Sequence, residues 1–261
     1  MICPDLDIKC GCRKEMTEVR LKCDFKVDKL PVSHNMMFVS LIKEALKKSD
    51  PDYYDKLYSF NGKANKKSKN FCFATRMKGF DIDGDVANIK DGVSLLISSP
   101  DAEFILYIYN GLLKINEFKY KDLSIKRERI SMLKEKTINS SEAVFRTLSP
   151  ICIKNNKNYF LKIDDETYED ELNYIAGKVL ENYRGRGLKE RLSFHNVKMK
   201  NIVVKQQIRD FEEKSGKNYL CVNSYDGIFK LSGNIEDLQD LYSLGLGFKR
   251  NQGFGMLEVV Y

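Results

Sequence analysis

The order in which strand and helix patterns follow one another most constrains the fold of this chain. Residues 19–27 alternate between apolar and charged side chains, which is typical of a strand with one solvent-exposed face. Next come a helical spacing of apolar residues over 36–47, strand patterns over 71–78 and 92–98, a helix over 101–113 and a strand over 115–120. This β-α-β-β-α-β order predicts a ferredoxin-like unit.

The second half of the chain repeats this order. Strand patterns cover 123–134 and 144–151, and the clearest helical periodicity lies at 172–183. Two long strand patterns, 194–209 and 218–231, predict a β-hairpin, which a helix over 235–244 and a strand over 256–261 follow. We therefore expect an α+β protein with two tandem ferredoxin-like (RRM-like) βαββαβ domains. Their predicted bounds are 17–122 and 123–261, behind a disordered N-terminal extension, 1–16.

The charge balance suits a polyanionic partner. The 261 residues include 44 Lys and Arg against 37 Asp and Glu, a net charge of +7. Much of the basic charge falls in the second half, where Arg184 and Arg186 follow the best helix and Lys198 and Lys200 lie on the predicted hairpin. We take these four as candidate residues for binding a polyanion, with an ordinary solvated surface as the alternative for each.

The sequence predicts neither a metal or cofactor protein nor a membrane protein. Cys3, Cys10 and Cys12 form no C-x-x-C pair and have no nearby His, so we expect neither a metal site nor another cofactor. No apolar run approaches the roughly 18 residues of a membrane helix, and the N-terminus has no signal-peptide core. The expectation is a cytoplasmic protein without membrane contact.

A glycine-rich loop is the most prominent local motif. Four glycines fall within residues 245–255, between a predicted helix and the last predicted strand, with Lys249 and Arg250 at the tip. Glycine lets backbone amides approach phosphates closely, and the basic side chains add charge for the same anions. The loop lacks the G-K-[ST] ending of a P-loop and the order of a Rossmann fingerprint. An ordinary tight connection is the alternative. The candidate anion-binding residues are Gly245, Gly247, Lys249, Arg250, Asn251, Gly253 and Gly255.

The spacing G-x-G-x-x-x-x-x-G-x-G before a final strand resembles the C-terminal signature of the repeat-associated mysterious proteins. Among these it is similar to the CRISPR-associated endoribonucleases that process precursor CRISPR RNA. Segments 30–35 (LPVSHN), 110–113 (NGLL) and 147–151 (TLSPI) agree in the same order.

The resemblance implies two ferredoxin-like domains and a loop that grips the RNA backbone. It also implies metal-independent cleavage by the RNA's 2′-hydroxyl, giving 2′,3′-cyclic phosphate and 5′-hydroxyl ends. The implied partners are CRISPR repeat RNA, as precursor and as mature guide, and other subunits of a CRISPR effector complex; the protein itself would be a monomer or a homodimer.

The resemblance also indicates where the chemistry lies. Many members carry a His after the first helix and a Tyr on it; here Tyr58 and Lys43 stand at those positions. His34, at the entrance to the first helix, is the imidazole expected near the site, and a capping role is its alternative. Our hypothesis is Tyr58 or His34 as proton donor, with Lys43 and Lys69 as electrostatic partners.

The missing His favours an alternative, a non-catalytic relative that holds repeat RNA. A general single-strand RNA module of the RRM type is a third reading. Against it, the sequence shows no paired aromatic motif on a central strand.

Overall fold

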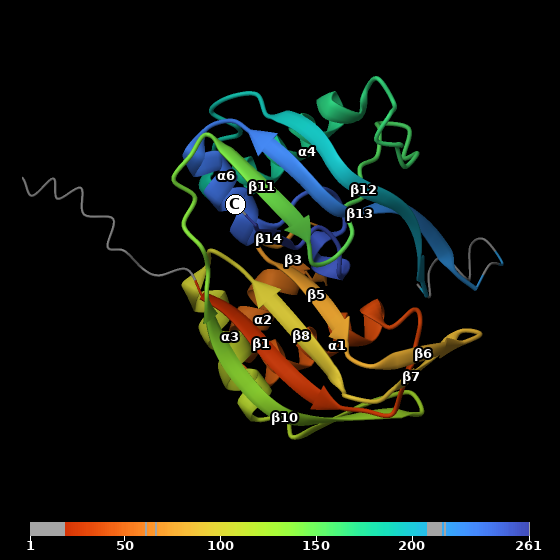
Figure 1. Cartoon of the computed structure of the whole chain (residues 1–261). Helices are drawn as coiled ribbons and strands as arrows, with labels where there is room; N and C mark the ends of the chain where they lie inside the picture. Colours follow the sequence, from red (N-terminus) through yellow and green to blue (C-terminus); the bar gives the residue numbers. More distant parts are fainter. Residues whose placement is uncertain (1–18, 61, 66, 208–215, 217, 261) are drawn as a thin grey trace, which may run out of the picture.

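The computed structural model describes residues 19–60, 62–65, 67–207, 216 and 218–260. The predicted N-terminal extension with its three cysteines, most of the charged turn in the long hairpin, and Lys66 lie outside the described residues. In Figure 1 the two halves of the chain lie one above the other.

The N-terminal half contains a five-stranded antiparallel sheet in the order β5-β8-β1-β10-β9. Without the edge strand β9, the order β10-β1-β8-β5 is that of a ferredoxin-like unit, in which α1 follows the first strand and α3 follows the third. The bounds are β1 Val19–Lys26, α1 Asn35–Ser49, β5 Cys72–Met77, β8 Val93–Ser98, α3 Ala102–Leu113, β9 Glu117–Tyr120 and β10 Leu123–Lys134.

One predicted boundary is wrong. The strand expected to close the first half, 115–120, forms only the edge strand β9, whereas β10 pairs with β1 through contacts such as Leu21 opposite Met132. The boundary near Asp122 therefore assigned the fourth strand of the first unit to the second. We propose that the change of domain falls between β10 and β11 (Glu142–Thr147).

Close packing of the two helices explains the segment 110–113. A Cβ on Gly111 would lie 1.9 Å from the carbonyl oxygen of Ala45, so α3 crosses α1 with the two backbones in contact. Around this crossing the core contains side chains from both helices and the sheet, among them Phe38, Leu41, Leu95, Ile108 and Phe118. This contact fixes α1, and with it one wall of the site.

Asp50-Pro51 ends α1 as expected, but a second helix, α2 (Pro51–Tyr58), starts there. The Asp50 carboxylate accepts a hydrogen bond from the Tyr53 amide at 2.8 Å, and Pro51 suits the first helical position. Shorter strands complete this half: β2 Lys29–Pro31, β3 Ser59–Phe60, β4 Lys63–Ala64, β6 Phe80–Asp83 and β7 Val86–Ile89. They form one small sheet, β2-β7-β6, and one two-stranded sheet, β3-β4.

The second half repeats the ferredoxin-like order in a four-stranded antiparallel sheet, β12-β13-β11-β14. Its other elements are α4 Tyr168–Arg184, β12 Ser193–Gln206, β13 Leu220–Ser232, α6 Ile235–Leu244, the short 3-10 helix η1 Arg250–Gln252 and β14 Leu257–Val259. The expected tandem ferredoxin-like architecture, including the long hairpin and the helix over 235–244, is confirmed. No helix in the described ranges combines the length and apolar composition that a membrane span needs.

A buried ion pair joins the two halves. The Arg20 guanidinium of β1 lies 3.1 Å from the Glu135 carboxylate and 2.9 Å from that of Glu258, and it donates to the carbonyl of Leu257 at 3.0 Å. Ser243 of α6 donates to the second oxygen of Glu135 at 2.8 Å. Because these groups satisfy one another out of water, they hold the halves in a fixed relation.

Candidate RNA-binding site

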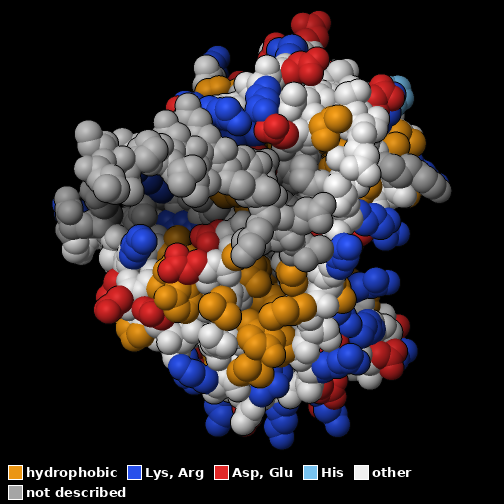
Figure 2. Space-filling view, turned by 90° about the vertical axis from the view of Figure 1, so that its left-hand side faces the viewer, with side chains coloured by type: hydrophobic (Ala, Val, Ile, Leu, Met, Phe, Trp, Pro, Cys, Tyr) orange, Lys and Arg blue, Asp and Glu red, His pale blue; other side chains and the backbone are white. Residues whose placement is uncertain are grey.

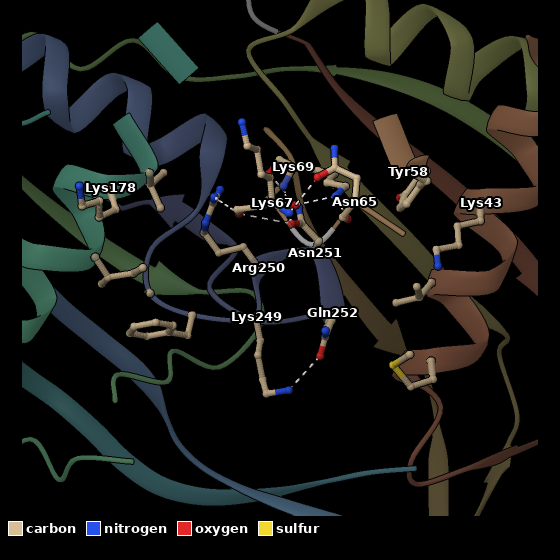
Figure 3. Close-up of a pocket in the computed structure, with 17 residues that line it drawn as sticks. Lys43, Tyr58, Asn65, Lys67, Lys69, Lys178, Lys249, Arg250, Asn251 and Gln252 are labelled. Atoms are coloured by element: carbon tan, nitrogen blue, oxygen red, sulfur yellow. Dashed lines mark hydrogen bonds between the residues drawn. The ribbon is translucent and has the colours of Figure 1, made fainter. Parts of the chain in front are cut away.

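A cavity of about 600 Å³ lies at the seam between the two halves. Figure 3 shows its lining residues, which come from five segments. The N-terminal half contributes α1, the end of α2 at Tyr58 and the stretch 65–69, and the C-terminal half contributes α4 and the glycine-rich loop. The residues that the argument uses are Lys43, Tyr58, Lys67, Lys69, Lys178 and the loop residues 247–252.

Two lysines gather around a tyrosine on the N-terminal wall. The ammonium nitrogen of Lys43 lies 4.9 Å from the centre of the Tyr58 ring, and that of Lys69 lies 5.3 Å from it. Three of the four residues predicted to be catalytic therefore lie together, although they come from α1, α2 and the segment before β5. Burial raises the pKa of the Tyr58 hydroxyl, so this group keeps its proton at neutral pH.

Lys69 is held in an environment that disfavours its charge. Its side chain is buried, and its ammonium group donates to the carbonyl oxygens of Asn65 at 2.7 Å and Lys67 at 2.5 Å. Burial lowers the pKa of Lys69, and the positive charge of Lys43 lowers it further. An anion such as a phosphate, bound between the two lysines, would stabilise the charged form of Lys69.

The tip of the glycine-rich loop is bonded to the N-terminal half. The Asn251 side chain accepts from the backbone amide of Lys69 at 2.8 Å and donates to the carbonyls of Lys69, at 3.0 Å, and Phe71. Asn35, at the start of α1, donates to the carbonyl of Gln252 at 3.1 Å. The loop therefore connects the two halves and positions Lys69 by its backbone.

Arg250 is a buried residue of the seam, which the sequence did not predict. The residue is 2% exposed, and its guanidinium donates to the hydroxyl of Ser68 at 2.9 Å and to the carbonyl of Leu244. Burial lowers its pKa to about 10. In the part of the chain that the structure describes, no carboxylate pairs with it. Through these bonds Arg250 holds the loop in place. A contact with RNA phosphates, as the sequence predicted, would have to use the same guanidinium group.

Lys249 is the more accessible cation of the loop. It adopts a left-handed backbone conformation, φ 58°, and its ammonium group donates to the side-chain oxygen of Gln252 at 2.9 Å. Partial burial lowers its pKa. It lies on the cavity lining beside Phe248, so it remains a candidate phosphate ligand.

The four glycines are explained by packing against the protein itself. Each has a positive φ, and a Cβ on Gly247 would lie 2.8 Å from the carbonyl oxygen of Cys152. On Gly255 it would lie 2.0 Å from the carbonyl of Leu246, and on Gly253 2.8 Å from the Asn35 amide. The glycine spacing is thus required for the loop to close between the halves. Only Gly247 among the four lines the cavity.

The charge of the lining is of one sign. Five lysines and Arg250 line the cavity, and none of its described lining residues is an Asp or Glu. Lys178 of α4 pairs with Glu181 at 2.7 Å, outside that lining. A concave, cationic space of this kind attracts phosphates more strongly than the same charges would on a flat surface.

His34 lies at the entrance to α1, as expected from the sequence, but it does not line the cavity. It is at the N-cap position of α1, and its side chain makes no capping bond. The ring is buried: Nδ1 donates to the carbonyl of Pro31 at 3.1 Å, and Nε2 accepts from the hydroxyl of Thr75 at 2.8 Å. Burial lowers its pKa, which keeps it neutral. Its role as a proton donor stays a prediction.

The other predicted RNA-binding residues lie outside the cavity. Arg184 forms ion pairs with Asp237 and, at 2.6 Å, with Asp240, and thereby ties α4 to α6. Arg186 is exposed and lies 3.8 Å from Glu236. Lys198 and Lys200 are exposed on β12.

Five polar lining residues were not among the predicted site residues: Asn65, Lys67, Ser68, Lys178 and Gln252. Lys178 has a signal in the sequence, because it lies on the polar face of the best-predicted helix. Asn65 and Lys67 occur in a lysine-rich stretch whose composition also fits a solvated loop, and only the packing of that stretch against the glycine-rich loop distinguishes the two.

Comparison with known proteins agrees with this arrangement. Residues 133–259 match the family model described as CRISPR associated protein Cas6, C-terminal. A curated relative from Methanocaldococcus jannaschii, named CRISPR-associated endoribonuclease Cas6 1, is 24% identical over 247 residues, which cover 92% of each chain.

Solved structures are similar over nearly the whole chain. One, titled an RAMP protein binding different RNA substrates, is 25% identical with a TM-score of 0.75, covering 93% of this chain and 100% of that one. The product of a Cas6-related gene from Pyrococcus furiosus has a TM-score of 0.76 at 23% identity, covering 93% and 98%. Family model, curated relative and shared fold agree with the resemblance seen in the glycine-rich motif: the chain is similar to Cas6 proteins in its C-terminal half by sequence pattern and over nearly its whole length by fold.

Proposed function

We propose that this protein binds CRISPR repeat RNA and cleaves the precursor transcript within the cavity at the seam. The observation that carries the proposal is the lining itself, which has six cationic side chains and no described carboxylate, with Lys43 and Lys69 gathered around Tyr58. The named activity of the M. jannaschii relative, which aligns over 92% of this chain, supports the same class of reaction.

The proposed reaction is attack of the RNA's 2′-oxygen on the adjacent phosphorus, with the 2′-hydroxyl proton passing to solvent water and the bond from phosphorus to the 5′-oxygen breaking. It leaves a 2′,3′-cyclic phosphate and a 5′-hydroxyl and uses no metal ion. The charge that develops on the phosphate oxygens needs nearby cations, the role we assign to Lys43 and Lys69. The departing 5′-oxygen needs a proton, and the Tyr58 hydroxyl, which stays protonated at neutral pH, is its proposed donor.

RNA outside the cavity would follow basic side chains on the C-terminal half. Lys249 continues the cationic lining along the loop, and Arg186, Lys198 and Lys200 are exposed to solvent. Backbone contacts of this type make affinity fall steeply with salt. Gly245, Gly253 and Gly255 shape the loop, and Asn251 orients Lys69. We therefore assign these four residues a structural role in the site and no direct contact with RNA.

A second function is favoured by one observation. Neither His34 nor His195, the two histidines of the chain, lines the cavity. A member of the family that holds repeat RNA without cutting it would have the same cationic lining and no need of an imidazole. The solved relative whose title describes binding of different RNA substrates fits this alternative.

The deciding experiment is incubation of the full chain with 5′-labelled CRISPR repeat RNA from its own genome, in excess EDTA. We expect one fixed cut, a cyclic phosphate on the 5′ product, and no cut when the nucleotide at the cleavage site is 2′-deoxy. Cleavage of the deoxy substrate would refute the 2′-hydroxyl mechanism. Tight, salt-sensitive binding with no product would establish the holding function instead.

A further inference from the structure

The C-terminal wall of the cavity carries an aromatic ring. Phe248, in the glycine-rich loop, is half-buried and lines the cavity, and it packs against the buried Cys152 and Phe254. Ile175 and Val179 of α4 line the same space. This wall is therefore apolar as well as cationic. The combination suits a nucleotide, because the faces of its base stack on aromatic rings and its phosphate is an anion.

A lysine lies over this ring. The ammonium nitrogen of Lys154 lies 5.0 Å from the centre of the Phe248 ring and donates to the side-chain oxygen of Asn158 at 2.7 Å. The turn that follows Lys154 is closed by Asn155, whose side chain accepts from the amide of Tyr159 at 3.1 Å. In the described part of the chain no carboxylate pairs with Lys154, so its charge is available to an anion.

Two cations therefore lie beside Phe248, as two lie beside Tyr58 on the opposite wall. Burial lowers the pKa of Lys249, and the positive charge of Lys154 also lowers it, so the two ammonium groups are close enough to repel. Figure 3 shows Lys249 apart from Lys43 and Tyr58, on the loop from the other half. An anion bound between Lys154 and Lys249 would offset their repulsion.

Phe248 shares its space with the proposed cleavage site. Among the described lining residues, Phe248 and Tyr58 are the aromatic ones. The volume of about 600 Å³ lies in the range of small-molecule pockets, about 300–1,000 Å³, so the cavity admits single nucleotides and not a duplex. The apolar area that Figure 2 shows on the N-terminal half, where α3 exposes Leu106 and Leu113, is separate, because no residue of α3 lines the cavity.

We propose that Phe248, Lys154 and Lys249 form a subsite for an unpaired nucleotide next to the scissile phosphate. Its base stacks on the side of the Phe248 ring that borders the cavity, and the two ammonium groups bind its phosphate. A phenyl ring has no hydrogen-bonding group, so the subsite accepts any base and selects one that is not already stacked in a duplex. This inference rests on the proposed function and specifies how the nucleotide beside the cut is bound.

The first test is a coupling measurement with the full chain and CRISPR repeat RNA from its own genome. A 2′-deoxy nucleotide at the cleavage site keeps the RNA intact, and an abasic nucleotide is placed at each position in turn. At one position next to the cut we expect the abasic change to weaken binding about tenfold. Phe248→Leu should weaken binding of the RNA with all its bases by a similar factor. The variant should then be insensitive to the abasic change at that position.

Phe160→Leu is the matched control. Phe160 is also half-buried and packs against the same buried cluster as Phe248, but it does not line the cavity. Its substitution should change neither the affinity nor the effect of the abasic position. Phe248→Tyr keeps the ring and should bind as the unchanged chain does. Lys154→Gln should weaken binding and reduce the salt dependence by about one phosphate contact.

A second measurement needs no substitution in the protein. RNA with 5-iodouridine at the coupled position is irradiated in the complex, and the cross-linked residue is identified by mass spectrometry. We expect the cross-link on Phe248.

The outcomes separate the subsite from the cutting activity. Losses that add for Phe248→Leu and every abasic position would overturn the subsite, and so would cross-links that map only to other residues. Cleavage of unmodified RNA together with such additive losses leaves the proposed function standing without the subsite. Coupling at Phe248 without any cleavage supports the subsite and refutes the cutting activity. A chain that does not bind the RNA refutes both.

Discussion

The two walls of the cavity have the same charge and use it differently. On the N-terminal wall, Lys43 and Lys69 gather around Tyr58, and the positive charge of Lys43 makes the charge of Lys69 less favourable. On the C-terminal wall, Arg250 donates to Ser68 and Leu244, and Lys249 donates to Gln252. The conspicuous glycine-rich motif thus acts mainly as a scaffold, while inconspicuous lysines from the other half supply the field for an anion.

Substitution of Arg250 is expected to have the largest effect on stability, and it tests whether the glycine-rich loop is a scaffold. Arg250→Ala should lower the free energy of unfolding by about 3 kcal/mol, because it leaves the buried Leu244 carbonyl and Ser68 hydroxyl without their donor. Urea denaturation measures this change, with Lys249→Ala, on the same loop but half-buried, as the milder control. Unchanged stability with lost RNA binding would show that Arg250 is a ligand and not a scaffold residue.

Lys69→Met should have the largest effect on chemistry. The variant keeps the length of the side chain but removes the cation beside the proposed scissile phosphate. We expect the single-turnover cleavage rate to fall about 100-fold and RNA affinity to fall much less. Rates and dissociation constants are measured on the same labelled repeat RNA. Equal losses in binding and in rate would assign Lys69 to ground-state binding alone.

Gly247→Ala tests whether the loop glycines serve packing. The new Cβ would meet the Cys152 carbonyl in addition to the strain of a positive φ, so we expect a loss of about 2 kcal/mol in stability. Gly84→Ala separates the cost of the steric contact from the cost of the positive φ. Gly84 has φ +59° but no atom within 4 Å of an added Cβ. The loss there should be about 1 kcal/mol. Similar losses at both positions would mean that the Cys152 contact relaxes easily.

The smallest predicted effect is a shift in pH dependence. As a cation with a lowered pKa, Lys69 loses its charge at a lower pH than an exposed lysine does, so the cleavage rate should fall as pH rises through that pKa. Lys43→Gln removes the like charge and should move this fall to higher pH, although burial keeps it below the ordinary lysine range. Normalised rate profiles of the two proteins measure the shift. A shift to lower pH would contradict the coupling between the two lysines.

Local patterns were sufficient for the elements of the fold, but not for their pairing. Alternation of apolar and charged residues predicted β1, and helical periodicity predicted α4 and α6, because these signals depend on neighbours in sequence. Whether β9 or β10 completes the first sheet depends on which of them pairs with β1, a non-local choice that neither pattern contains. The boundary near Asp122 failed for that reason.

The site was predictable in its location and less so in its chemistry. The family resemblance indicated Lys43, Tyr58 and Lys69 in separate segments, and the fold brings them together. Burial is what the sequence could not show. Arg250 and His34 carry side chains suited to phosphate binding and proton transfer, yet tertiary packing places both away from solvent and satisfies them with protein groups.

The bond between Asn251 and the backbone of Lys69 joins positions 182 residues apart. Contacts of such long sequence separation form late, because loop closure must precede them. Each half can build its own sheet and core from nearer contacts, but neither half alone contains the cavity. Any chemistry located at the seam therefore requires that both halves are folded and docked against each other.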